Sequence, residues 1–166
     1  MNIRRSTPAD LPFLEEMLVE AAHPPWILPR PTLARTLADP IAGRYLLGWG
    51  RVGDQAVIAE DRDGNPIGAA WYRTFDADEP GFGFVAADVP EIALAVAAPF
   101  RGQRVGTALI AALVEVARAE GERALSLSVS VANPSALRIY QSAGFVPVGG
   151  DAESPTMLLD LSRRST

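Results

Sequence analysis

The hydrophobic and polar positions in the first forty residues predict one short strand and two helices. Residues 2–5 have the pattern of a strand. Ser6 or Thr7 followed by Pro8 is typical of a helix start, because a hydroxyl caps the helix and proline needs no hydrogen-bonded N–H there. Apolar residues then recur three and four positions apart, which is the period of one helix face. After several prolines, residues 32–39 predict a second helix.

The middle of the chain changes to strand patterns. Residues 55–60 and 67–75 are predicted strands, and the Asp63-Gly64-Asn65-Pro66 turn between them predicts a hairpin. Residues 76–90 are rich in Asp, Gly and Pro, so we expect a loop there.

The second half of the chain alternates strands with helices. The predicted elements are a strand at 91–97, a helix at 104–120, a strand at 124–131, a helix at 134–143 and closing strands near 145–149 and 155–161. Antiparallel strands followed by a strand–helix–strand unit predict an α/β (α+β) fold. We expect one domain over residues 1–166, with a mixed central sheet of six to seven strands and helices on both faces.

Residues 99–108 join a predicted strand to a predicted helix and carry the groups of an anion site. The first turn of a helix has N–H groups without helical partners and the positive end of the helix dipole. The stretch adds two glycines that leave room, two arginines that add charge and one hydroxyl donor: Gly102, Gly106, Arg101, Arg104 and Thr107. These residues favour a pyrophosphate cradle, and a purely structural glycine turn is the alternative.

The strand before this turn has two different faces. Ile92, Leu94 and Val96 share one face and small alanines share the other, so one side fills a core while the other leaves space. An ordinary buried strand has the same alternation. The predicted helix after the turn is expected to bury Val105, Leu109 and other apolar residues, Ala108 and Ala112 included.

The turn resembles the acetyl-CoA loop of the GNAT superfamily of N-acetyltransferases. That loop has Arg or Gln, two further residues, Gly, any residue, and then Gly or Ala. Here the matching frame runs from Arg101 to Gly106, and Arg104 stands where glycine is usual. Backbone N–H groups still bind an anion if the dihedral angles at that position suit a residue other than glycine.

A second stretch, residues 133–145, resembles the C-terminal motif of the same family. Asn133 and a following proline form a helix start, Tyr140 comes seven residues after the asparagine, and Gly144-Phe145 ends the motif. The close resemblance covers residues 90–149.

The resemblance implies an acetyl-CoA-dependent N-acetyltransferase acting on a primary amine. It implies cofactor-binding residues on the strand, the loop and the second helix: Leu94, Ala95, Val96, Arg101, Gly102, Gln103, Arg104, Val105, Gly106, Thr107 and Asn133. It assigns to Tyr140 the protonation of the departing CoA thiolate. A structural cap is the alternative for Asn133, and a core aromatic is the alternative for Tyr140.

The expected chemistry is direct attack of a neutral amine on the thioester in a ternary complex. The chain has no cysteine, which excludes a thiolate nucleophile and disulfides. A general base is needed, and Glu91 is the first candidate because it begins the strand at 91–97, which the resemblance places beside the cofactor. The alternative for Glu91 is a solvated carboxylate at the end of a strand. A backbone N–H near Val96 is expected to stabilise the oxyanion.

The amino-acid composition limits the kinds of partner that we expect for this protein. Hydrophobic residues make up 48% of the chain and the net charge is −5, which favours a globular protein and argues against a general nucleic-acid surface. All 15 basic residues are arginine, and the single histidine, His23, cannot form a His-rich metal site, so no metal is expected. No apolar stretch is long enough to span a membrane, and Glu15 and Glu16 argue against a signal peptide. We expect a cytoplasmic protein, and the resemblance allows a homodimer.

Two other functions stay open at this point. A non-catalytic acyl-CoA sensor on the same fold would keep the loop without needing Tyr140. A dinucleotide-binding oxidoreductase is less favoured, because the loop lacks the full Gly-x-Gly-x-x-Gly pattern.

The expected acceptor is a small-molecule or peptide amine. Five aromatic residues are candidates for the walls of its pocket or for ordinary packing: Trp26, Trp71, Tyr72, Phe82 and Phe84.

Overall fold

A seven-stranded mixed sheet organises the molecule. The computed structural model describes residues 1–162. The strands are β1 (Asn2–Arg5), β2 (Gln55–Glu60), β3 (Pro66–Arg73), β4 (Glu91–Val96), β5 (Ala124–Ser128), β6 (Val146–Gly150) and β7 (Pro155–Asp160), in the spatial order β1-β2-β3-β4-β5-β7-β6. Every neighbouring pair is antiparallel except β4 and β5, which are parallel. The predicted mixed sheet is confirmed.

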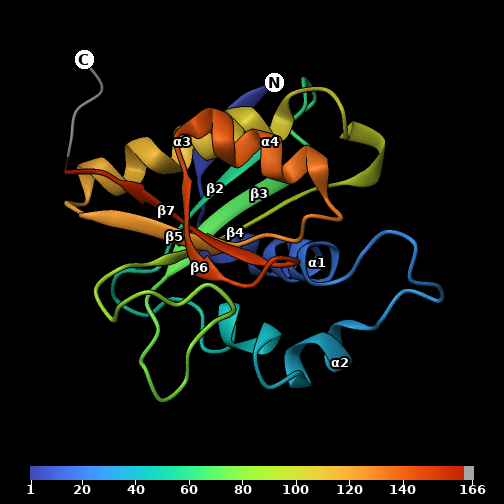
Figure 1. Cartoon of the computed structure of the whole chain (residues 1–166). Helices are drawn as coiled ribbons and strands as arrows, with labels where there is room; N and C mark the ends of the chain where they lie inside the picture. The colour runs from blue at the N-terminus through green and yellow to red at the C-terminus, as the bar shows by residue number, and fades with distance from the viewer. Residues whose placement is uncertain (163–166) are drawn as a thin grey trace.

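Helices cover both faces of this sheet, as predicted (Figure 1). The helices are α1 (Leu11–Ala22), α2 (Leu33–Ala38), α3 (Val105–Ala119) and α4 (Pro134–Ala143), with short 3-10 turns η1 (Pro8–Asp10), η2 (Ala42–Tyr45) and η3 (Ala98–Phe100). Helices α3 and α4 lie on one face, and α1 lies on the other with α2 beyond it. Within residues 1–162, no helix has both the length and the apolar character needed to cross a membrane.

Each face of the sheet has its own hydrophobic core. Tyr72 of β3 and Leu109 of α3 belong to the core under α3 and α4. Trp71, the neighbour of Tyr72 along β3, belongs to the core under α1 and η2. Both aromatic side chains are completely buried, because successive residues of a strand point to opposite faces and each face is covered. Trp71 and Tyr72 are therefore core residues and do not form pocket walls.

Two sequence expectations need correction. The predicted strand at 124–131 ends at Ser128, because beyond it the backbone makes only separate hydrogen bonds, from Val129 N–H to the carbonyl of Pro155 at the start of β7 (3.2 Å) and from Val131 N–H to the Glu153 carbonyl (2.9 Å). Ala108 and Ala112 of α3 are only half-buried, whereas Ile110 and Ala117 are buried. Helix α3 contacts α4 as well as the sheet, so its buried arc includes the side that faces α4.

Candidate active site

Strands β4 and β5 separate soon after they begin, which opens the sheet. Their only paired residues are Glu91 and Ser126, with the Ser126 N–H donating to the Pro90 carbonyl at 2.9 Å. On the other edge of β4, the Ala97 N–H donates to the Ile67 carbonyl of β3 (2.9 Å). Backbone groups alternate in direction along a strand, so those of every second residue before Ala97 also face β3. The groups of the residues between them face the opening toward β5.

This alternation divides the predicted cofactor-binding residues of β4 into those that face the opening and those that face β3. Leu94 and Val96 are half-buried, and their backbone groups face the opening. Ala95 pairs with Ala69 of β3, and its side chain is buried in the core under α1. The structure therefore brings the backbones of Leu94 and Val96 to the opening and directs the backbone of Ala95 away from it.

The turn between β4 and α3 leaves the first helical N–H groups without a side-chain cap. The first helical hydrogen bond runs from the Ala108 N–H to the Arg104 carbonyl (3.2 Å), so the N–H groups of Val105, Gly106 and Thr107 precede the helical pattern. Within residues 1–162, no side chain caps this end of α3. Residues 101–104 are exposed. An anion therefore has access to bare amide donors at the positive end of the helix dipole.

Arg104 adopts the left-handed backbone conformation, with a φ of 63° and a ψ of 17°. Among the described residues it is the one non-glycine residue with a positive φ. This conformation costs a non-glycine residue about 1–2 kcal/mol. Backbone strain of this kind is common at functional sites, and Arg104 occupies the position where the resemblance expects glycine.

The other polar side chains of the turn brace it. Arg101 donates from Nε to the Val96 carbonyl (3.1 Å) and from Nη2 to Glu20 Oε2 of α1 (2.6 Å). Gln103 donates from Nε2 to the Pro99 carbonyl (3.1 Å). The Arg104 side chain has no hydrogen bond or ion pair to another described residue, so its guanidinium is available to an approaching anion.

Gly106 has a different role from the one that its sequence position suggests. A Cβ at this residue would lie 3.0 Å from Ile139 Cδ1 of α4, 3.7 Å from Leu94 Cδ2 and 3.9 Å from Val96 Cγ2. Gly106 is buried, so the missing side chain lets α3 approach α4 and β4 closely. Gly102, in contrast, has a φ of +74° and open space around it.

The two residues of the C-terminal motif lie at opposite ends of α4. Asn133 caps the helix, since its Oδ1 accepts the Ala136 N–H at 3.2 Å. Tyr140 is 7% exposed and packs edge-on against Phe145, with ring centroids 5.9 Å apart. Burial raises the pKa of Tyr140, which keeps its hydroxyl protonated. Asn133 and Tyr140 thus both have structural roles here, whatever further role each has with a ligand.

Glu91 is buried at the point where β4 and β5 separate. Its side chain is 1% exposed, so the alternative of a solvated strand-end carboxylate is wrong. Oε1 accepts the Tyr45 hydroxyl (2.7 Å) and the Gly83 N–H (2.8 Å), and Oε2 accepts the Gly81 N–H (3.1 Å). Burial raises the pKa of Glu91, and the three hydrogen bonds offset part of that rise.

Sequence reasoning missed Tyr45 and the two glycines that surround Glu91. A Cβ on Gly81 would clash with the Glu91 carboxylate, and a Cβ on Gly83 would clash with the backbone of Leu127 in β5. Both glycines are therefore required by close approach. The available signal was the pair of glycines two positions apart, eight to ten residues before a carboxylate that starts a strand.

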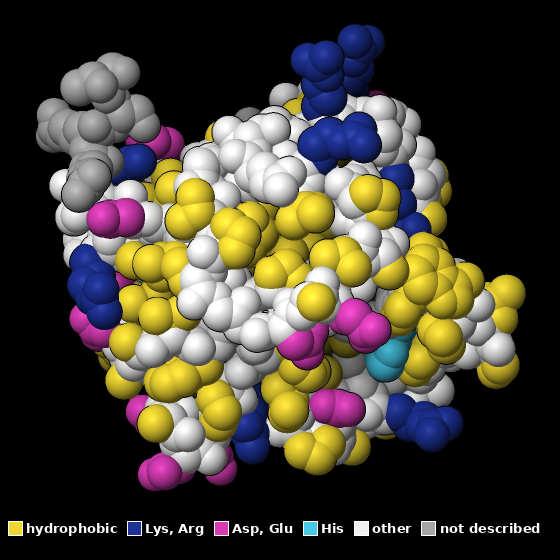
Figure 2. All heavy atoms as spheres, viewed as in Figure 1, with side chains coloured by type: hydrophobic (Ala, Val, Ile, Leu, Met, Phe, Trp, Pro, Cys, Tyr) yellow, Lys and Arg dark blue, Asp and Glu magenta, His cyan; other side chains and the backbone are white. Residues whose placement is uncertain are grey.

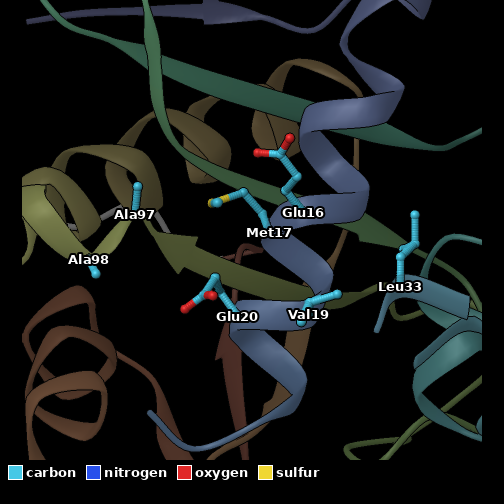
Figure 3. A pocket seen from close by; sticks show the side chains of 7 residues that line it. All are labelled: Glu16, Met17, Val19, Glu20, Leu33, Ala97 and Ala98. Atoms are coloured by element: carbon cyan, nitrogen blue, oxygen red, sulfur yellow. The ribbon is translucent and has the colours of Figure 1, made fainter. Parts of the chain in front are cut away.

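A cavity of about 440 Å³ lies between α1 and the carboxyl end of β4 (Figure 3). Met17 and Glu20 of α1 point toward Ala97 and Ala98, and Leu33 at the start of α2 closes another side. The lining is mainly apolar and includes the side chains of Glu16 and Glu20. Because Glu20 also binds Arg101, the cavity adjoins the turn before α3.

The face that Figure 1 presents is apolar in its middle. Figure 2 shows apolar side chains gathered there, with arginine side chains along the upper right edge. Of the aromatic candidates for pocket walls, Trp26 and Phe82 are exposed (64% and 56%), and Phe84 is half-buried.

Comparisons with known proteins agree with this architecture. Residues 15–145 match the family model described as the acetyltransferase (GNAT) family. The chain is 30% identical over 127 residues to mycothiol acetyltransferase from Sanguibacter keddieii, a match that covers 74% of this chain and 38% of that protein. The chain thus spans well under half the length of this curated relative.

Solved structures share the fold over nearly the whole chain. The crystal structure of ribosomal-protein-alanine N-acetyltransferase from Brucella melitensis matches with a TM-score of 0.70 and 24% identity, covering 97% of this chain and 100% of that one. A phosphinothricin acetyltransferase from Sinorhizobium meliloti, solved in complex with acetyl-CoA, matches with a TM-score of 0.69 and 22% identity, covering 99% and 92%. The predicted fold is confirmed.

Proposed function

The chain belongs to the GNAT acetyltransferase family, and from this premise we propose that it transfers the acetyl group of acetyl-CoA to a primary amine by direct attack in a ternary complex. One observation carries the proposal: a parallel strand pair separates directly beside a helix N-terminus that has no side-chain cap. A long thioester with a diphosphate at one end fits that combination of an open strand edge and free amide donors.

The residues of the turn would hold the diphosphate. The N–H groups of Val105, Gly106 and Thr107 and the guanidinium of Arg104 are the available donors. Arg101, Gly102 and Gln103 would serve mainly by shaping the turn, because the two side chains are already bonded within it. This assignment keeps all seven positions of the predicted loop in the site and divides them into ligand-binding and bracing residues.

The pantetheine arm and the reacting carbonyl would lie in the opening between β4 and β5. The backbone groups of Leu94 and Val96 that face the opening would hydrogen-bond an amide-bearing chain as a neighbouring strand would. An N–H of the same row would stabilise the oxyanion of the tetrahedral intermediate, as amide donors do in acyl transfer. Ala95 would contribute only its small size, and Asn133 would contact the cofactor from the start of α4.

Two titratable groups would handle the protons. A lysine-like amine has a pKa of about 10.4 and must lose a proton before it attacks. Glu91 would take that proton through a water molecule, and burial raises its pKa toward the range in which a general base works best. Tyr140 would protonate the leaving thiolate, because a thiol has a pKa of about 8.5 and a tyrosine above it holds a proton ready to transfer.

An amine panel tests the proposed activity directly. CoA release is followed with polyamines, aminoglycosides, amino acids and peptides, and acetyl-CoA affinity is measured by calorimetry in parallel. Turnover with at least one amine class supports the proposal. Acetyl-CoA binding without CoA release on any amine would favour the second candidate, a non-catalytic acyl-CoA sensor. The cytoplasmic location and the homodimer stay predictions.

A further inference from the structure

The carboxylate of Glu91 is held by parts of the chain that are far apart in sequence. Two of its hydrogen bonds come from the N–H groups of Gly81 and Gly83, in the loop before β4. The third comes from the Tyr45 hydroxyl in η2. The loop lies so close to the carboxylate that a side chain at Gly81 would clash with it.

Tyr45 joins these parts together. Its hydroxyl donates to Glu91 Oε1 (2.7 Å) and accepts the Phe82 N–H (3.0 Å), so one group bridges the carboxylate and the loop. The Tyr45 ring packs against Phe75 and Phe82, with centroids 5.0 Å and 6.2 Å away. The Tyr45 carbonyl accepts the indole N–H of Trp71 (3.1 Å). Both the ring and the backbone of Tyr45 are therefore fixed.

The charged groups near Glu91 are bonded elsewhere. Arg73 lies opposite Glu91 on β3, but its guanidinium binds Asp54 and the carbonyls of Arg44 and Leu47. The Arg44 side chain itself donates to the Pro80 carbonyl. Among the described residues, Tyr45 is thus the one side chain that hydrogen-bonds the Glu91 carboxylate.

The strand on the other side adds no charge. Ser126 of β5, in register with Glu91, is completely buried and its hydroxyl has no hydrogen-bond partner among the described residues. The negative charge of Glu91 is therefore stabilised by neutral donors, of which only the Tyr45 hydroxyl can be removed without changing the backbone.

We propose that Tyr45 is a positioning residue for the deprotonation of the amine: it holds Glu91 and the Gly81–Gly83 loop in one fixed arrangement at the point where β4 and β5 separate. This inference rests on the proposed function, because it gives Tyr45 a role through the base that the reaction needs. The same arrangement fixes the backbone of Phe82 while its ring stays exposed. Burial raises the pKa of Tyr45, so its hydroxyl remains a donor.

The test is the substitution Tyr45→Phe, which removes only the hydroxyl of Tyr45. The matched control is Tyr72→Phe, since Tyr72 is also buried, but its hydroxyl has no partner among the described residues and it packs in the core on the opposite face. The hydrogen bond from Tyr45 favours the charged carboxylate, so removing it should raise the pKa of Glu91. The acid limb of the kcat/KM profile should move to higher pH, because Glu91 must be ionised to act as base.

Several readouts separate positioning from a general loss of stability. Acetyl-CoA affinity should stay within about twofold of wild type in Tyr45→Phe, and Tyr72→Phe should leave the pH profile unchanged. The carbon-13 signal of the Glu91 carboxyl, assigned with Glu91→Gln, should titrate at higher pH in Tyr45→Phe than in wild type. A lower melting temperature with an unmoved acid limb and an unmoved carboxyl titration would overturn the proposal.

The carboxyl titration also decides the matter without any activity. If wild type releases no CoA with any amine, the proposed function fails, while a raised Glu91 midpoint in Tyr45→Phe still supports the link between Tyr45 and Glu91. If Tyr45→Phe does not fold, the wild-type protein supplies the test. The amide proton signals of Gly81 and Gly83 should then change with the same midpoint as the Glu91 carboxyl, and signals that ignore this titration would contradict the arrangement.

Discussion

The guanidinium of Arg101 binds the carboxylate of Glu20 at 2.6 Å and the carbonyl of Val96 at 3.1 Å, so the turn before α3 is tied both to α1 and to β4. In this position Arg101 acts mainly as a brace. A glutamine, which the family motif also allows here, can keep a hydrogen bond to the Val96 carbonyl but loses the charge.

We therefore expect Arg101→Gln to keep the Kd for acetyl-CoA within about threefold of wild type. Arg101→Ala loses the bond to the strand, and one hydrogen bond contributes about 0.5–1.5 kcal/mol, so its Kd should rise by up to about tenfold. Isothermal titration calorimetry at one fixed salt concentration measures both. Equal and large losses in the two variants would instead mean that Arg101 contributes mainly through its charge.

Arg104 offers a way to separate backbone strain from charge. Its φ of 63° is costly for any side chain but glycine, and its guanidinium has no partner among the described residues. Arg104→Gly and Arg104→Ala both remove the charge, so both should weaken acetyl-CoA binding to the same extent. The glycine variant should be the more stable of the two by about 1 kcal/mol in urea unfolding, because only alanine keeps the strain. Equal stabilities would show that the turn relaxes.

Gly106→Glu should abolish acetyl-CoA binding. The sequence suggests that the carboxylate would repel a phosphate, but the structure gives a steric reason: a side chain at 106 enters the space between Ile139, Leu94 and Val96. It would therefore close the opening from the side of α3. The control is Gly149→Glu, which adds the same charge where no atom lies within 4 Å of the new Cβ. Calorimetry that finds wild-type affinity for Gly106→Glu would contradict this account.

The elements of the fold were accessible from sequence because their signals are local. The helix at Val105–Ala119 and the strand at Glu91–Val96 agree with their predicted ranges to within a residue or so, since periodicity, capping residues and glycine stops lie within each segment. The predicted hairpin between β2 and β3 follows in the same way from its turn residues.

The environment of Glu91 was not accessible, because it depends on contacts between distant segments. Tyr45 belongs to a four-residue 3-10 turn with no periodic signal, and Gly81 gains its role only when the loop folds onto β4. Gly106 illustrates the same limit: its glycine character is visible in the sequence, but the neighbour that requires it, Ile139, lies on another helix. Close approach between elements has no signature within either one.

Tyr140→Phe should lower kcat while leaving the Kd for acetyl-CoA nearly unchanged. The substitution keeps the buried ring and its contact with Phe145 and removes only the proton donor. General acid catalysis contributes about 10²–10⁴-fold in typical enzymes, so a loss of at least tenfold is expected with a thiolate leaving group. Steady-state kinetics with the best amine from the panel measures this. Unchanged turnover would remove Tyr140 from the mechanism and leave it as a core aromatic.

The partly buried ion pair between Arg4 and Asp10 predicts a pH-dependent stability that is independent of the active site. Two hydrogen bonds from the Arg4 guanidinium, 2.8 Å and 2.9 Å long, lower the pKa of Asp10 from 3.8 to about 2. A carboxylate with a depressed pKa stabilises the fold above the pKa of the unfolded chain, and this stabilisation is lost as the pH falls through the folded value.

Asp10→Asn should therefore lower the free energy of unfolding by about 1–2 kcal/mol at pH 7, after allowance for solvent screening of the partly exposed Arg4. The difference from wild type should shrink as the pH approaches 2, where Asp10 takes up its proton in the folded protein. Urea unfolding at both pH values measures the change, and Asp78→Asn, on an exposed loop residue, is the control. A loss of stability that is equal at pH 7 and pH 2 would mean that the asparagine disturbs packing and that the charge of Asp10 contributes nothing.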